Sequence, residues 1–141
     1  METKHNEVIL DIRDLRVIYK TDLETVRAVN GINLTIAKGK TYGLVGETGA
    51  GKTTTALSIL RLLPSNTGRI TGGQIFFNGR NLLELDEHRM RAVRGNLVSM
   101  VFQDPMSSLN PVYTVDDQIG EAIRLHNEGL SREQIEKRVD D

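Results

Sequence analysis

The stretch Gly46-Glu47-Thr48-Gly49-Ala50-Gly51-Lys52-Thr53 decides the fold of this chain. It fits the pattern G-x-x-x-x-G-K-[ST], whose glycines let the backbone turn tightly and bring N–H groups against phosphate oxygens. The lysine of the pattern supplies positive charge for the β- and γ-phosphates, and the hydroxyl that follows it suits Mg²⁺. The sequence therefore predicts a loop that binds nucleotide phosphate through Gly46, Glu47, Thr48, Gly49, Ala50, Gly51, Lys52, Thr53 and Thr54.

The flanks of the loop have the character that this motif requires. Residues 41–45 form a short, mostly apolar run, which predicts a buried strand that ends at Gly46. After Lys52, apolar residues recur at helical spacing until Pro64, which predicts a helix over 52–63. A helix N-terminus that faces an anion favours phosphate binding over a glycine-rich turn that binds nothing.

Composition narrows the class of protein. A length of 141 residues suits one domain, and a net charge of −1 gives no support for a nucleic-acid partner. The absence of cysteine excludes disulfides and thiol chemistry. Three histidines, His5, His88 and His126, lack metal-ligand spacing and are interpreted as surface residues.

No segment of the sequence indicates export or a membrane span. The N-terminal residues lack the apolar stretch of a signal peptide, and no apolar run approaches the ~20 residues that cross a bilayer. We therefore expect a cytoplasmic chain, in which the sequon Asn33-Leu34-Thr35 is accidental.

Strand patterns precede the loop. Apolar and polar residues alternate over 15–20 and over 32–37, which predicts antiparallel strands with one packed face, and residues 21–25 read as a hairpin loop. Beyond the loop, residues 74–77 predict a strand that the turn Asn78-Gly79 closes.

The sequence pattern over residues 86–141 predicts further helices and a strand. A charged helix is expected over 86–94, with Asp86 as its N-cap and Gly95 as its stop, and an apolar strand over 97–102. Capping boxes at Thr114 and Ser131 then open two helices. One face of the first of these helices is marked by the mostly apolar residues Val115, Ile119, Ala122, Ile123 and His126.

Two strings together carry a resemblance to a known family. They are the loop through Thr54 and the string Val101-Phe-Gln-Asp-Pro-Met-Ser-Ser-Leu-Asn-Pro111. From about Leu10 onward, the chain resembles the ATP-binding subunit of ATP-binding-cassette (ABC) transporters, specifically the oligopeptide, dipeptide and nickel importer group. The resemblance implies an α/β fold, in which a P-loop NTPase (RecA-like) core carries an N-terminal antiparallel β subdomain and the start of a helical subdomain.

The implied domain organisation is one partial nucleotide-binding domain over residues 1–141. Its expected parts are antiparallel strands at about 7–40, the P-loop and helix at 41–63, a strand and helix at 70–96, the Gln-loop at 97–111 and the start of the helical subdomain at 112–141.

The resemblance also implies cofactors and site residues. ATP and Mg²⁺ are the expected cofactors, with Lys52 and Gln103 as catalytic residues and with Thr53 and Gln103 at the metal. Tyr19 corresponds to an aromatic residue that stacks on adenine, although it also fits an ordinary aromatic of a half-buried strand. Gln103 reads alternatively as a polar residue that ends a strand. Met106 and Tyr113 either face a membrane subunit or pack within this chain.

The expected partners are transmembrane permease subunits, a second ATP-binding subunit (as a homodimer or heterodimer) and, indirectly, a solute-binding protein. These would place the protein at the cytoplasmic face of the cell membrane, where it powers import of peptides or nickel. The permease and solute-binding subunits would set the transported solute.

The sequence holds no Leu-Ser-Gly-Gly-Gln signature, no Asp-Glu strand after Gln103 and no histidine beyond His126. We therefore expect a chain truncated within the helical subdomain, which binds ATP without turnover. The alternatives are an inactive nucleotide-binding remnant and a non-transport ABC ATPase. A GTPase is disfavoured because the guanine-reading string Asn-Lys-x-Asp is absent. A small-molecule kinase is disfavoured because forty residues of predicted strands precede the loop.

Overall fold

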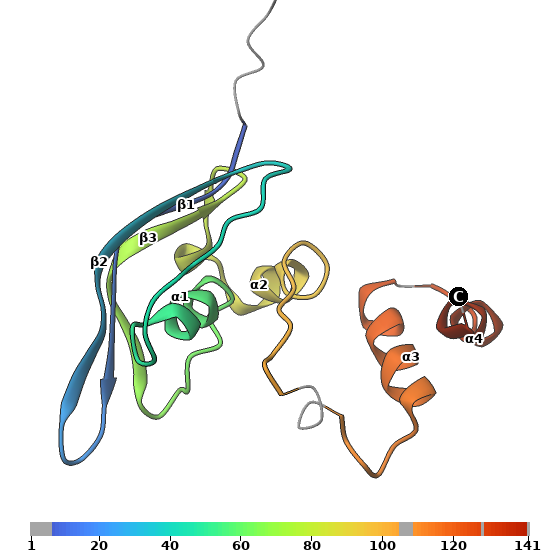
Figure 1. Cartoon of the computed structure of the whole chain (residues 1–141). Helices are drawn as coiled ribbons and strands as arrows, with labels where there is room; N and C mark the ends of the chain where they lie inside the picture. The colour runs from blue at the N-terminus through green and yellow to red at the C-terminus, as the bar shows by residue number, and fades with distance from the viewer. Residues whose placement is uncertain (1–6, 105–108, 128, 141) are drawn as a thin grey trace, which may run out of the picture. The chain divides into compact units, whose positions relative to one another are not determined.

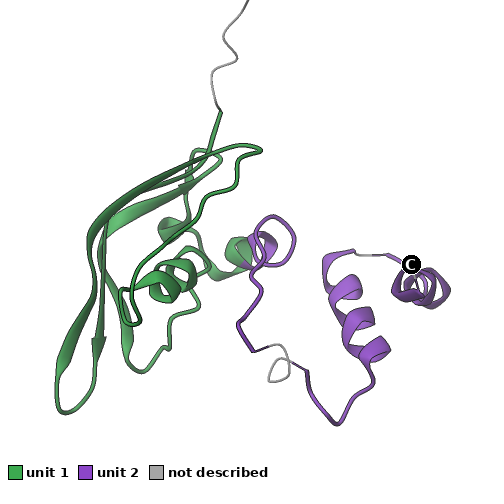
Figure 2. Ribbon diagram, in the orientation of Figure 1, with its two compact units in different colours: residues 1–90 green, residues 91–141 purple. Residues whose placement is uncertain are grey.

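The computed structural model describes residues 7–104, 109–127 and 129–140. His5 and Met106 lie outside these residues. The chain divides into two compact units, residues 1–90 and residues 91–141 (Figure 2). Each unit is described by itself.

The first unit is built on a four-stranded antiparallel sheet (Figure 1). The strand order is β2-β1-β3-β4, and the strands are β1 (Val8–Lys20), β2 (Thr25–Ala37), β3 (Gly68–Phe77) and β4 (Arg80–Asn81). The predicted antiparallel strands and the polar hairpin loop are confirmed, and the strands extend further than their alternation indicated. The turn at Asn78 and Gly79 is also confirmed, with φ of 47° and 76° as a two-residue hairpin of mirror-image type requires.

A bulge at Asp14 interrupts the sheet. Asp14 has a φ of 45°, and the register of β1 shifts here against both β2 and β3. Glycines with positive φ stand on both neighbouring strands, Gly31 at 77° and Gly73 at 93°. A Cβ on Gly73 would lie 2.5 Å from the carbonyl oxygen of Asp14 and 2.6 Å from the Cα of Leu15. The bulge therefore fits because its neighbour on β3 carries no side chain.

The core of the first unit lies between the sheet and the helical segments. These segments are α1 (Lys52–Ile59), a 3₁₀ turn η1 (Leu82–Glu84) and the first residues of α2 (Glu87–Val93), a helix that continues past the boundary of the unit at Met90. The apolar side chains with the least exposure are Ile12, Leu15, Val17, Ile75, Leu82 and Met90. The predicted α2 is confirmed together with its signals, because the N–H of Arg89 donates to the carboxylate of Asp86 at 2.8 Å and Gly95 follows with a φ of 79°.

Helix α1 ends four residues earlier than its apolar pattern predicted. Arg61 adopts a left-handed φ of 53°, its N–H donates to Ser58 O at 3.1 Å, and the N–H of Leu62 donates to Leu57 O at 2.8 Å. These two bonds form a Schellman motif, which closes a helix by satisfying its last carbonyls. Glycine usually occupies the left-handed position, so an arginine there left no signal in the sequence.

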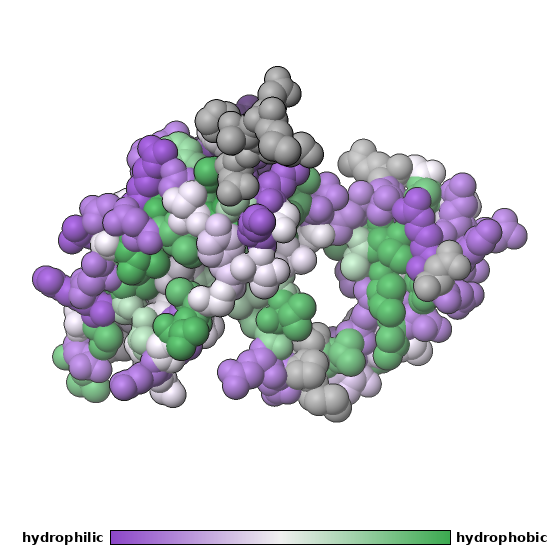
Figure 3. Space-filling model, turned by 45° about the horizontal axis from the view of Figure 1, so that its top comes forward, coloured by the Kyte–Doolittle hydropathy of each residue, from purple (hydrophilic) through white to green (hydrophobic). Residues whose placement is uncertain are grey.

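Two predicted strands are absent among the described residues. Residues 41–45 and 97–102 form no strand, and the side chains of Val45 and Val101 are 94% and 93% exposed. Neither segment has a neighbouring strand to pair with among the described residues. The sheet of the first unit consists of β1 to β4, and residues 97–102 take part in a single bridge, between Arg94 and Val98. An apolar run becomes a strand only where a neighbouring strand accepts its backbone hydrogen bonds. Figure 3 shows apolar residues, coloured green, among the polar ones on the surface in this view.

The second unit contains the helices α3 (Val115–His126) and α4 (Arg132–Asp140). Both predicted caps are confirmed. The N–H of Asp117 donates to Thr114 Oγ1 at 3.2 Å, while Ser131 and Gln134 exchange side chain-to-backbone bonds at 3.3 and 2.9 Å.

The apolar face predicted for α3 is only partly buried. Val115 and Ile119 remain 53% and 42% exposed, and the buried residue of the helix is Gly120. A Cβ at Gly120 would lie 3.5 Å from Ile135 of α4, so the two helices meet at a glycine rather than along the apolar face. No helix in the described part of the chain has the length and apolar character to cross a membrane.

The bulge yields a stability prediction. Gly73→Ala should lower the free energy of unfolding by more than ~2 kcal/mol, because the new Cβ meets backbone atoms as well as an unfavourable φ. Gly79→Ala is the matched control, since its φ of 76° is similar and no atom lies within 4 Å of the added carbon. It should cost only ~1 kcal/mol. Urea unfolding followed by circular dichroism measures both, and equal losses would contradict the packing argument.

Candidate phosphate-binding site

The phosphate loop of the first unit is an exposed turn that leads directly into α1. The N–H of Ala50 donates to Glu47 O at 3.1 Å, which closes the turn. Gly49 and Gly51 have φ of 84° and 82°, a region that side chains other than glycine's rarely adopt. The glycines predicted from the motif therefore stand where the backbone needs them.

Gly51 fixes the loop to the sheet. A Cβ at this position would overlap the carbonyl oxygen of Ala28 and would lie 3.3 Å from Val29 Cγ2, both on β2. The N–H and the hydroxyl of Thr55 donate to Gly51 O at 2.8 and 2.9 Å. The start of α1 thus lies against β2 at a distance that only glycine permits.

Lys52 spans the loop. Its ammonium donates to the carbonyl oxygens of Gly46 and Glu47, both at 2.6 Å. The side chain therefore runs from the end of the loop back to its beginning and brings a full positive charge to the loop backbone. That Lys52 binds phosphate, as the motif predicts, stays a prediction.

The first turn of α1 offers backbone donors to an anion. Its N-cap, Gly51, provides no side-chain acceptor, and the first turn contains no acidic residue. Within the described residues, no hydrogen bond engages the N–H groups of Lys52 and Thr53. Unpaired N–H groups and the helix dipole favour an anion at this end of a helix. The side chain of Thr53 is exposed, as a hydroxyl ligand of Mg²⁺ would need to be.

Tyr19 also lies in this unit, close to α1. Its hydroxyl is 3.3 Å from Thr54 Oγ1, and the ring is half-buried. Tyr19 pairs with Gly68 of β3, where an added Cβ would lie 3.2 Å from the ring carbon Cε1. The structure therefore brings the predicted aromatic residue and the helix of the phosphate loop together.

The remaining predicted residues belong to the second unit. Gln103 lies in an irregular, exposed segment, and Tyr113 is 62% exposed. Sequence reasoning missed Ala28, whose carbonyl oxygen faces Gly51, and Gly68, which leaves room for the Tyr19 ring. A glycine in a strand was the signal available for Gly68, and a backbone carbonyl such as that of Ala28 leaves no signal.

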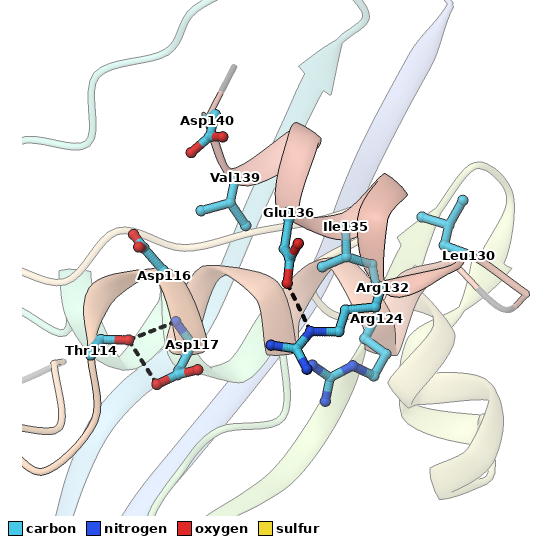
Figure 4. A pocket seen from close by; sticks show the side chains of 10 residues that line it. All are labelled: Thr114, Asp116, Asp117, Arg124, Leu130, Arg132, Ile135, Glu136, Val139 and Asp140. Carbon is cyan, nitrogen blue, oxygen red and sulfur yellow. Dashed lines mark hydrogen bonds and ion pairs between the residues drawn. The ribbon is translucent and has the colours of Figure 1, made fainter.

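The second unit has a cavity of about 820 Å³ between α3 and α4 (Figure 4). Arg132 donates to Glu136 across one turn of α4 at 2.7 Å, and this hydrogen bond raises the pKa of the guanidinium. The cavity contains none of the predicted site residues. In the described part of the chain, no cluster of three or more His, Cys, Asp or Glu residues could hold a metal ion.

Comparison with known proteins identifies the family. The model of the family described as ABC transporter matches residues 29–141, most of the chain. The chain belongs to the ABC transporter family. The resemblance inferred from the sequence is therefore confirmed.

Curated relatives of this ABC transporter chain carry names from peptide transport. It is 48% identical over 134 residues to a probable peptide ABC transporter ATP-binding protein of Sinorhizobium fredii, covering 95% of this chain and 40% of the relative. It is 42% identical to the dipeptide transport ATP-binding protein DppD of Bacillus subtilis and 44% identical to the oligopeptide transport ATP-binding protein OppD of Escherichia coli. Each of these matches covers 94% of this chain and 39% of the relative. The ABC transporter chain thus spans about 40% of the length of these relatives.

Solved ABC cassettes share the fold. A dimeric ATP-binding cassette in a post-hydrolysis state, bound to ADP and Pi, matches with a TM-score of 0.76 and 23% identity over 93% of this chain and 54% of its own. A dimeric bacterial ABC transporter cassette matches with a TM-score of 0.78 and 24% identity, over 92% and 53%. The α/β class predicted from the sequence is confirmed, with the strand differences described above.

The close approach of the loop to β2 gives a second prediction. Gly51→Ala should lower stability by about 2 kcal/mol more than Gly49→Ala, because the two glycines have nearly equal φ but only Gly51 faces the Ala28 oxygen. Nothing lies within 4 Å of a Cβ at Gly49. Chemical unfolding without nucleotide measures the difference, and two equally stable variants would show that β2 does not constrain the loop.

Proposed function

We propose that this chain binds Mg-ATP as the nucleotide-binding part of a subunit of an ABC importer of oligopeptides or dipeptides. The observation that carries the proposal is the arrangement of Gly51, Lys52 and Thr53 at the start of α1. It offers unpaired N–H groups, an ammonium and an exposed hydroxyl at one helix end. The names of the relatives support peptides as the solute class. Nickel is the alternative that the sequence resemblance leaves open.

The residues have distinct roles in this proposal. The loop N–H groups and Lys52 hold the phosphates, and the hydroxyl of Thr53 is a ligand of Mg²⁺. Tyr19 offers its ring to adenine, and Gln103 offers an amide oxygen to the metal or to a water. When bound, Mg²⁺ neutralises charge on the phosphate oxygens. Lys52 already bonds two carbonyl oxygens, so it exchanges these bonds for phosphate oxygens without moving its charge away from the loop.

The proposal extends to partners and location. A second ATP-binding subunit is supported by the dimeric state of the solved cassettes. Permease subunits and, through them, a solute-binding protein complete an importer, whose ATP-binding subunits lie at the cytoplasmic face of the membrane. The 141-residue sequence lacks the signature string, so we propose that this chain alone binds ATP with little or no hydrolysis.

Removing the ammonium tests nucleotide binding. Lys52→Ala should weaken Mg-ATP binding by more than about a hundredfold, because charge-assisted hydrogen bonds contribute ~1.5–3 kcal/mol each. Lys40→Ala removes the same charge from an exposed position before the loop and is the matched control. Titration calorimetry measures both, with circular dichroism to show that each variant is folded. Unchanged affinity in Lys52→Ala would refute the proposed site.

Phosphate release separates binding from turnover. The purified chain with Mg-ATP should release no phosphate beyond a blank, because hydrolysis needs a positioned water and charge stabilisation as well as a phosphate loop. A coupled phosphate assay under saturating ATP measures this. Sustained release that disappears in Lys52→Ala would show that the chain is a working ATPase.

A further inference from the structure

We propose that Thr54 is a positioning residue that holds the Tyr19 ring against the start of α1 and so couples base recognition to the phosphate loop. This proposal rests on the proposed ATP binding, and it assigns one side chain a role in that binding. The observation is the hydroxyl pair, Tyr19 Oη to Thr54 Oγ1 at 3.3 Å, which joins residues 35 positions apart.

Thr54 differs from its neighbour in the motif. Its residue is 8% exposed, whereas Thr53 is exposed and free to meet a ligand. A buried hydroxyl needs a partner, and in the described structure the only hydrogen bond of the Thr54 hydroxyl goes to Tyr19. The backbone of Thr54 is held as well, since Ser58 Oγ donates to Thr54 O at 2.7 Å. Thr54 is therefore a fixed point to which the ring is attached.

The strands confine the ring from its sides. In the register of the sheet, Tyr19 stands between Val26 of β2 and Gly68 of β3. The ring passes close to Gly68, where a side chain would meet its Cε1 carbon, and its hydroxyl reaches α1. The ring thus has two constraints, a glycine under one edge and a hydroxyl bond at its tip.

Such a constraint affects binding of the base more than binding of phosphate. An aromatic ring that is already ordered loses less conformational freedom when a purine stacks on it, which improves affinity. Breaking the hydroxyl bond should therefore weaken ligands that contain adenine and leave a base-free polyphosphate unaffected. A direct contact of Thr54 with phosphate would instead weaken both ligands.

The test compares ATP with inorganic tripolyphosphate, each with Mg²⁺, by calorimetry on the full 141-residue chain. Thr54→Val keeps the side-chain shape and removes the hydroxyl, and Tyr19→Phe removes the other half of the pair while keeping the ring. Each should weaken ATP binding about threefold to tenfold, which corresponds to one net hydrogen bond. The double variant should lose no more ATP affinity than either single variant. The tripolyphosphate affinity of Tyr19→Phe should stay unchanged, because Tyr19 lies on β1, outside the phosphate loop.

Thr54→Ser is the conservative control, because it keeps the hydroxyl and should bind ATP within about twofold of the parent chain. Melting curves establish whether each variant is folded. If Thr54→Val does not fold, Tyr19→Phe alone provides the test. Equal losses for ATP and tripolyphosphate, additive losses in the double variant, or unchanged ATP affinity would overturn the proposal. A parent chain that binds neither ligand would remove the proposed function itself.

Discussion

The contact between Gly51 and the carbonyl oxygen of Ala28 is the constraint on which the phosphate site depends. It seats the end of the loop on β2 at a separation that excludes any side chain. The start of α1 inherits this placement: Lys52 reaches back along the loop, and Thr55 bonds to Gly51 O. The antiparallel sheet is therefore a support for the loop and not a separate module, because a shift of β2 would move the helix N-terminus with it.

The buried residues of helix α1 carry hydroxyl groups. Its buried residues are Thr54, Thr55 and Ser58, and each hydroxyl has a partner: Tyr19, Gly51 O and Thr54 O. The bonds of Thr55 and Ser58 go to residues four positions earlier, whereas the bond of Thr54 joins the helix to Tyr19 of β1. Burying a hydroxyl without a partner costs ~1–3 kcal/mol, so each of the three buried hydroxyls needs its partner. This arrangement suits a site that must present N–H groups and an ammonium to an anion in a fixed geometry. The residues proposed to contact the base and the phosphates then lie on β1 and α1, which the bond between Tyr19 and Thr54 already joins.

Local features were predictable from the sequence and non-local ones were not. The glycine loop, the caps at Thr114 and Ser131 and the Asn78-Gly79 turn depend on neighbours within a few residues, and all are present. The apolar runs over 41–45 and 97–102 were assigned as strands from composition alone, yet strand formation depends on a partner that composition does not reveal. The end of α1 was missed because Arg61 takes a conformation usually left to glycine. At the candidate site, the motif predicted Lys52 and Thr53, while the support from Ala28 required the sheet register.

The most direct test of this account is an amide NMR titration of the ¹⁵N-labelled chain with Mg-ATP, because it reports every backbone N–H at once. The account predicts that shift changes concentrate at residues 46–54, which form the loop and the start of α1, with smaller changes at Tyr19. Changes concentrated instead in the charged cavity between α3 and α4, or no change at the loop at saturating ATP, would contradict the central claim that the loop seated on β2 is the nucleotide site.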